Sequence, residues 1–222
     1  MNPYIELDNI SFGYKKTGFR IRGVSARLYN RETTIITGGN GSGKTTLSKL
    51  MIGILKADSG KTFVCGQDIK NMSLSAAAEK VGYLFQNPDR QLFCSTAMEE
   101  IMFSLRQKGV DERAAAETAR ALLARFSMAH KANEFPLKMS RGEKQRLALL
   151  AVFVMNPGFY ILDEPSSGID EENKDKLVGM LEEFKQQGAG LCIITHDNAL
   201  ISRLADRRIT MADGRIVSDE KA

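Results

Sequence analysis

Hydrophobic and polar residues repeat with two different periods along this chain. Alternation with a period of two, rich in β-branched residues, predicts short strands, and apolar residues three or four apart predict helices. The expected strands cover residues 4–7, 10–14, 19–28, 33–37, 61–65, 81–85, 159–162 and 191–195. The expected helices cover residues 45–55, 96–106, 111–126, 140–149, 171–187 and a segment that ends near 205.

Particular residues mark several of the boundaries. Thr96 with Glu99 and Ser140 with Glu143 both have the spacing of a capping box. Asp111 is expected to cap the helix at 111–126. The DSG run at 58–60 is expected to end the helix before it. The DG pair at 213–214 predicts a hairpin between two short extended runs.

The order of these elements predicts the architecture. Strands come first, a strand and a helix follow, the middle is all helical, and strands and helices alternate again afterwards. We therefore expect an α/β fold with a mainly parallel core sheet, an N-terminal antiparallel β lobe and an inserted helical lobe. In this interpretation residues 1–222 form a single domain, with the core in 1–86 and 156–222 and the helical insert in 87–155.

Composition narrows the class of protein. A chain of 222 residues with 43% hydrophobic and 26% charged residues is ordinary for a globular protein. Its longest apolar stretch, 147–155, is too short to span a bilayer. The net charge of +4 does not argue for nucleic acid as a partner. The three cysteines lack metal-ligand spacing, which favours reduced residues of a cytoplasmic protein.

The strongest chemical signal is GGNGSGKT at residues 38–45, which fits the phosphate-loop pattern between a strand and a helix. Glycines let the backbone wrap a polyphosphate, so that successive N–H groups point at the anion. Lys44 is expected to reach the β- and γ-phosphates, and the Thr45 hydroxyl can bind Mg²⁺. This pattern predicts the fold of a P-loop nucleoside triphosphatase.

A second signal is FYILDEP at residues 159–165, where a buried strand ends in two carboxylates. In triphosphatases of this kind the first carboxylate, Asp163, holds Mg²⁺. The second, Glu164, is placed to polarise a water molecule for attack on the γ-phosphate.

Together these motifs resemble those of the ATP-binding cassette (ABC) ATPases, over nearly the whole chain. Gln86 matches the Q-loop glutamine, MSRGEKQR at 139–146 stands where the LSGGQ signature would be, SSGID at 166–170 resembles the D-loop, and His196 matches the switch histidine. Tyr14 stands where the family has an aromatic residue that stacks on adenine.

The resemblance implies an ATPase that uses ATP and Mg²⁺. It implies catalytic roles for Glu164, His196, Lys44 and Gln86, and Mg²⁺ contacts from Thr45, Gln86 and Asp163. The residues implied to contact nucleotide are Tyr14, Gly38, Gly39, Asn40, Gly41, Ser42, Gly43, Lys44, Thr45, Thr46, Ser140 and Gly142. Of these, Ser140 and Gly142 belong to the signature, which in the family addresses the ATP of the other subunit in a head-to-tail homo- or heterodimer.

The signature departs from the family at two positions, since Arg141 stands for the usual glycine and Glu143 for the usual glutamine. Arginine adds bulk at the helix start and also a cation suited to phosphate. We expect the loss of geometry to dominate, so that the isolated chain hydrolyses ATP slowly as a homodimer.

FQNPDRQLF at 85–93 is similar to the segment after the Q-loop in energy-coupling-factor (ECF) ATPases, which power vitamin and transition-metal uptake. This implies a peripheral protein at the cytoplasmic face of the membrane, with an integral coupling subunit and a substrate-binding membrane subunit as partners. We expect residues 87–93 to contact the coupling subunit; alternatively, Leu92 and Phe93 pack in the chain's own core. Other functions left open are the ATPase of another ABC transporter class, a soluble ABC ATPase outside transport, and a non-hydrolysing binding subunit.

Overall fold

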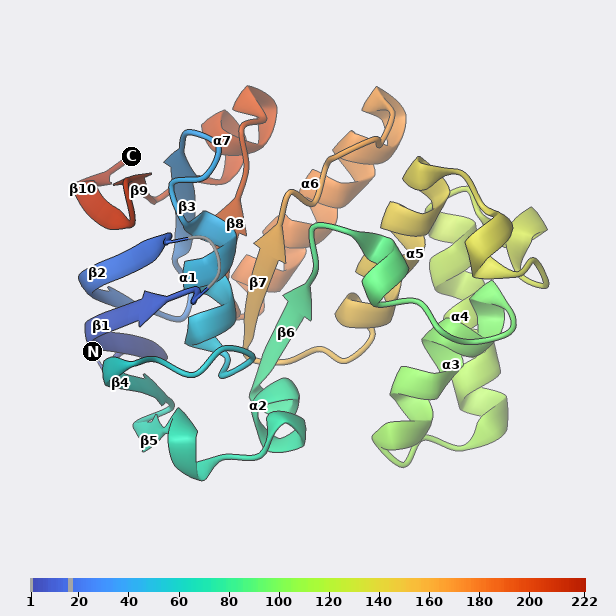
Figure 1. The fold of residues 1–222 in the computed structure, drawn as a ribbon. Coiled ribbons are helices and arrows are strands. Elements are labelled where there is room, and N and C mark those ends of the chain that lie inside the picture. The colour runs from blue at the N-terminus through green and yellow to red at the C-terminus, as the bar shows by residue number, and fades with distance from the viewer. Residues whose placement is uncertain (1, 16–17) are drawn as a thin grey trace.

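Two sheets organise the chain, and helix α1 (Lys44–Met51) packs between them (Figure 1). The structure is a computed structural model that describes residues 2–15 and 18–222. It has the α/β fold that the sequence predicts, with an antiparallel sheet beside a mainly parallel one.

The antiparallel sheet has the strand order β2-β1-β4-β5. Its strands are β1 (Ile5–Gly13), β2 (Arg20–Leu28), β4 (Ser59–Val64) and β5 (Gln67–Asp68). The two runs expected at 4–7 and 10–14 form one strand, in which a register shift falls where Asn9 has a φ of 49°.

The core sheet has the order β10-β9-β3-β8-β7-β6, and its strands are parallel except for β10. The strands are β3 (Thr33–Gly38), β6 (Val81–Leu84), β7 (Phe159–Asp163), β8 (Gly190–Ile194), β9 (Arg207–Ala212) and β10 (Arg215–Lys221). The expected hairpin joins β9 to β10, and both turn residues, Asp213 and Gly214, have the positive φ that its turn requires.

Strands β3, β6, β7 and β8 of the core sheet are buried on both faces, which explains their continuous apolar runs. On β7, Phe159 and Ile161 face α1 and the antiparallel sheet. Tyr160 and Leu162, the alternate residues, face the core formed with α5 (Arg141–Phe153), α6 (Glu171–Gln186) and α7 (Asn198–Leu204).

Helix α1 ends earlier than the sequence predicts. The expected helix reached residue 55, but α1 ends at Met51. Gly53 has a φ of 75°, the left-handed conformation that terminates helices, so this glycine ends α1 before the DSG run is reached. A short helix that was not expected, α2 (Leu74–Lys80), precedes β6 and is capped by Ser73.

The segment between β6 and β7 is helical and stands beside the core sheet, away from the antiparallel sheet (Figure 1). It contains α3 (Ala97–Gln107), α4 (Glu112–Arg125) and α5. The short 3-10 helices of the chain are Ile69–Asn71, Pro88–Arg90, Ala129–Lys131 and Pro136–Lys138. The division into core and insert at residues 87 and 155 stays a prediction.

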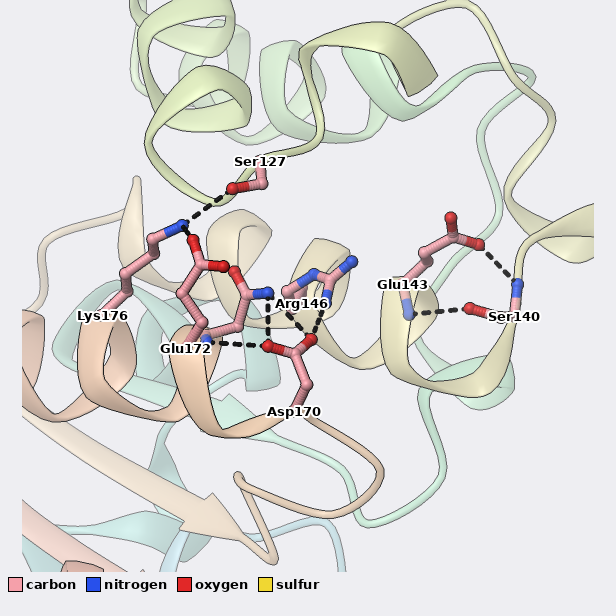
Figure 2. Close-up of polar contacts among 8 residues, drawn as sticks. Ser127, Ser140, Glu143, Arg146, Asp170, Glu172 and Lys176 are labelled. Atoms are coloured by element: carbon pink, nitrogen blue, oxygen red, sulfur yellow. Dashed lines mark hydrogen bonds and ion pairs between the residues drawn. The ribbon is translucent and has the colours of Figure 1, made fainter.

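The caps of these helices agree with the sequence in part. Asp111 accepts hydrogen bonds at the start of α4, as expected. Thr96 accepts the Glu99 N–H, but the Glu99 carboxylate pairs with Arg106, so the expected capping box is only half formed. The complete capping box lies at α5, where Ser140 and Glu143 bond to each other's backbone N–H groups (Figure 2).

Candidate active site

The predicted phosphate loop joins the end of β3 to the start of α1. Gly38, Gly41 and Gly43 have φ values of 141°, 79° and 106°, which favour glycine. A Cβ atom at Gly38 would lie 2.2 Å from the Met211 carbonyl oxygen. The loop is therefore shaped by glycine, and its backbone packs directly on β9.

Lys44 begins α1 and lies along the inner side of this loop. Its side chain is buried, and its Nζ donates hydrogen bonds to the carbonyl oxygens of Gly38 at 2.6 Å and Gly39 at 3.1 Å. The loop thereby holds a cation beside the start of a helix, where N–H groups and the helix dipole favour an anion.

Asp163 ends β7 directly beneath α1. Its Oδ2 accepts a hydrogen bond of 2.6 Å from the Thr45 hydroxyl. Burial raises the pKa of this carboxyl, although the Thr45 hydrogen bond and the charges of Lys49 and Lys44 oppose that rise. Among the described residues, Asp163 Oδ1 is buried and lacks a hydrogen-bond partner.

Glu164 follows Asp163 and faces the histidine at the end of the neighbouring strand. Its Oε1 lies 3.8 Å from His196 Nε2. Burial raises the pKa of Glu164, while the field of His196 lowers it. A carboxyl with a raised pKa at a strand end is suited to accept a proton.

These residues meet because β3, β8, β7 and β6 are adjacent parallel strands whose carboxyl ends share one edge of the sheet. A cleft of about 570 Å³ opens at this edge. Its lining residues are Tyr14, Phe19, Asn40, Gly41, Gly43, Lys44, Thr45, Thr46, Gln86, Asp163, Glu164, Ile194 and His196.

Most residues predicted from the sequence therefore line one cleft, but some do not. Gly38, Gly39 and Ser42 belong to the phosphate loop without lining the cleft. Ser140 and Gly142 lie outside it as well, at the start of α5.

Phe19 lines the cleft beside Tyr14, and sequence reasoning missed it. The two ring centroids are 6.5 Å apart, and the Tyr14 N–H donates to the Phe19 carbonyl. An aromatic residue just before the second strand of a hairpin, opposite another aromatic, was the available signal. The intervening residues 16–17 lie outside the described part of the chain.

A phosphate loop at the start of a helix, an Asp-Glu pair after a neighbouring strand and a shared cleft at the carboxyl edge of a parallel sheet define a P-loop nucleoside triphosphatase. The profile of the family described as "ABC transporter" matches residues 21–167. The chain belongs to this family, and it is an ATP-binding, ATP-hydrolysing subunit of a transporter.

Similar proteins include the energy-coupling factor transporter ATP-binding protein EcfA of Methanothermobacter thermautotrophicus. It is 33% identical over 217 residues, which cover 97% of this chain and 70% of that protein. A Pyrococcus furiosus protein whose name describes an ABC transporter ATP-binding protein is 34% identical over 212 residues, covering 96% of this chain and 81% of that one.

Among solved structures, cbiO1 from Clostridium perfringens, part of the ABC transporter complex cbiONQ, has a TM-score of 0.81 and 27% identity. The match covers 100% of this chain and 89% of cbiO1. A dimeric ATP-binding cassette in a post-hydrolysis state, bound to ADP and Pi, has a TM-score of 0.88 at 23% identity and supports the fold. That match covers 98% of both chains.

Proposed function

We propose that this chain is the ATPase subunit of an ECF-type importer that takes up a vitamin or a transition-metal ion. The observation that carries the proposal is the placement of residues 85–93, the segment that resembles ECF ATPases. Gln86 lines the nucleotide cleft, while its neighbour Phe85 lines an apolar groove of about 410 Å³. One segment thus touches both the ATP site and a surface suited to a membrane subunit.

The groove lies between α2, β6 and α3, and its rim carries exposed apolar side chains. Leu74 and Phe103 line it, and Phe93 packs edge-on against Phe103 with ring centroids 4.9 Å apart. Exposed apolar side chains grouped in this way are typical of an interaction site. We assign this groove to an apolar helix of the integral coupling subunit.

The expectation that residues 87–93 contact the coupling subunit needs one correction, at Leu92. Leu92 is 5% exposed and packs in the core with α3 and α5, whereas Phe93 is exposed. Glu100, itself buried, accepts the N–H groups of Phe93 and Cys94 and so fixes this turn. Leu92 faces inward and Phe93 outward, so Phe93 is the residue to test for docking.

In the proposed reaction, the loop N–H groups and Lys44 hold the phosphates of ATP, and Tyr14 with Phe19 stacks on the base. Glu164 takes a proton from water as the water oxygen bonds to the γ-phosphorus. The bond from that phosphorus to the bridging oxygen then breaks, which releases ADP and phosphate. His196, close to Glu164, contacts the γ-phosphate side of the cleft.

The donor set fits Mg²⁺. The buried Asp163 Oδ1 without a partner among the described residues, with the Thr45 hydroxyl beside Oδ2, offers the hard oxygen ligands that Mg²⁺ prefers. Thr45, Asp163 and Gln86 would hold it. When bound, Mg²⁺ neutralises charge on the phosphates. Within residues 2–15 and 18–222 there is no cluster of three His, Cys, Asp or Glu side chains able to hold a metal.

Ser140 and Gly142 lie outside the cleft, so we propose that they address the ATP of a second ABC ATPase subunit across a head-to-tail dimer. The partners also include an integral coupling subunit and a substrate-binding membrane subunit, which would place the chain at the cytoplasmic face of the membrane. No helix in the described part of the chain is long and apolar enough to cross a bilayer.

Purification of the assembled complex from membranes tests this proposal. We expect a second ATPase subunit or a second copy, both membrane subunits, and a bound vitamin or metal ion. Recovery with ribosomes or nucleic acid would instead favour a soluble ABC ATPase. Membrane subunits with a solute of another kind would favour another transporter class.

Glu164→Gln tests the catalytic step. We expect the variant to bind Mg-ATP and to accumulate a closed dimer, because loss of a positioned base costs about 10²–10⁴-fold in rate. Steady-state ATPase assays and size-exclusion chromatography with ATP would measure both effects. Wild-type turnover in the variant would remove Glu164 from the mechanism.

A further inference from the structure

The first two turns of α5 lie against the loop at residues 164–170, which begins with Glu164. The contacts come from helix positions 141, 142, 145 and 146. Positions 141 and 145 are four residues apart, as are 142 and 146, so all four lie on one face of the helix.

Two of these contacts lie near the surface. Arg146 Nη1 is 3.0 Å from Asp170 Oδ2, a pair that Figure 2 shows reaching from α5 to the start of α6. Arg141 Nη2 is 3.2 Å from the Ser167 hydroxyl oxygen. Asp170 and Arg141 are solvent-exposed, and exposed polar contacts contribute little to stability.

Gln145 makes the buried contact of this face. Its side chain is 1% exposed, and its Nε2 donates to the carbonyl oxygens of Glu164 at 3.2 Å and Pro165 at 3.4 Å. A buried amide in this position is costly unless it is bonded, so the geometry of the helix and that of the loop are fixed together.

Glu164 needs such support because its backbone conformation is unfavourable. Its φ is 52°, and a left-handed conformation in a residue other than glycine is strained and persists only where the surrounding structure imposes it. The Glu164 N–H donates to the Ile194 carbonyl on β8 at 2.8 Å. Its carbonyl accepts from Gln145. The residue is thus held from both sides, by β8 and by α5.

We propose that Gln145 is a positioning residue for Glu164. Its side-chain amide holds the carbonyl groups of residues 164 and 165, and thereby keeps the Glu164 carboxylate aimed into the nucleotide cleft. The inference rests on the proposed role of Glu164 as the base. It makes the start of α5 a determinant of the hydrolysis rate within its own subunit.

Gln145→Met tests this, since methionine keeps the length and volume of the side chain but cannot donate. We expect kcat to fall by about 10–100-fold, because misplacement by about 1 Å costs about 10²-fold. The KM for Mg-ATP should stay within about twofold, since the phosphate loop is untouched. Amide hydrogen exchange at residues 164–170, measured without nucleotide, should become faster.

The matched control is Lys176→Met on α6. Lys176 also makes two polar contacts, with Ser127 and Glu172, but lies away from this loop (Figure 2). We expect wild-type kcat and wild-type exchange at 164–170 in this variant. A folded Gln145→Met chain with either wild-type kcat or unchanged exchange would overturn the proposal.

A second variant separates positioning from loss of fold. If Gln145→Met fails to fold, Gln145→Asn, which keeps the amide but is one methylene shorter, is judged by the same readouts. Normal turnover in Glu164→Gln would instead overturn the base role and leave the exchange result standing.

Discussion

Gly142 sets the distance between α5 and the loop at 164–170. The family resemblance implies that this glycine contacts phosphate, and within its own chain a Cβ there would lie 2.3 Å from the Gly168 carbonyl oxygen. The structure therefore gives Gly142 a role within its own chain. The absent side chain lets two backbones touch.

Gly142→Ala should consequently lower Tm, since forcing a methyl group into a packed contact costs about 1–3 kcal/mol. At this chain length each kcal/mol corresponds to about 2–4 °C. The control is Gly179→Ala inside α6, where a Cβ meets nothing within 4 Å and helix propensity favours alanine. We expect the control to raise Tm. Thermal unfolding measures both, and equal shifts would contradict the close contact.

The expectation that Arg141 and Glu143 weaken the signature stays a prediction. Arg141 is exposed and bonded to Ser167, and Glu143 is turned back onto the Ser140 N–H and Lys131. Replacing both, as Arg141→Gly with Glu143→Gln, should raise kcat by about tenfold, equivalent to about 1.4 kcal/mol of transition-state stabilisation. Steady-state assays decide, and a rate at or below wild type would show that the signature is not degenerate.

The pH dependence of stability follows from the Glu164 pKa, which folding raises. A carboxyl whose pKa is raised by folding destabilises the native chain while ionised, and this penalty disappears as the pH falls through the raised pKa. Glu164→Gln should therefore increase Tm at pH 8 without nucleotide, by an amount that shrinks at acid pH.

Glu143→Gln should change Tm in the opposite direction to Glu164→Gln. The Ser140 N–H lowers the pKa of Glu143, so its ionised form stabilises the folded chain above the normal glutamate range. We expect this variant to lower Tm at pH 8, with a loss that fades in acid. Thermal melts across pH measure both variants, and shifts of the same sign would contradict the assignment.

At the scale of elements, β6 is tied to α1 by a buried pair of hydroxyls. Tyr83 Oη and Ser48 Oγ are 2.9 Å apart, and Ser48 also donates to the Thr45 carbonyl. Tyr83 lines the apolar groove as well. This contact links the wall of the groove to the helix that carries Thr45.

Tyr83→Phe should cost about 1 kcal/mol, the usual net value of a buried hydrogen bond, and so lower Tm by about 2–4 °C. Tyr160→Phe is the control, because the Tyr160 hydroxyl has a long contact of 3.5 Å with Asn156. Calorimetry compares the two, and an equal loss in both would show that the Ser48 contact contributes nothing.

The sequence predicted the parallel core and the cleft well because their signals are local. Buried strands read as apolar runs, and the phosphate loop and the Asp-Glu pair each occupy consecutive positions. It was less complete where partners are distant in the chain. The core partners of Leu92 lie on α3 and α5, which left its two alternatives open, and Phe19 enters the cleft through hairpin pairing. The predicted end of α1 was wrong for a local reason, because Gly53 ends the helix before the DSG run.

At the scale of the whole molecule, the apolar groove predicts how ATP hydrolysis is coupled to transport through the membrane subunit. Phe93→Ser should lower transport and binding of the coupling subunit, because it removes an exposed aromatic side chain beside the groove. Val217→Ser on β10 is matched in exposure, at 61% against 66%, and should change neither. Transport in vesicles and co-purification measure the outcome. Full coupling with Phe93→Ser would place the docking surface elsewhere.

The turn between β9 and β10 contacts the phosphate loop, although the two segments are far apart in the sequence. The Gly214 N–H donates to the Ser42 carbonyl at 3.0 Å, and the Gly214 carbonyl accepts the Arg22 N–H. A Cβ at Gly214 would lie 1.9 Å from the Arg20 carbonyl oxygen, so a glycine is needed for this approach. During synthesis, a nascent chain can carry its complete GGNGSGKT sequence long before this turn has been made. The loop gains its Gly214 contact only after the chain has been translated through residue 214, so the phosphate-loop sequence exists well before the contact that braces it.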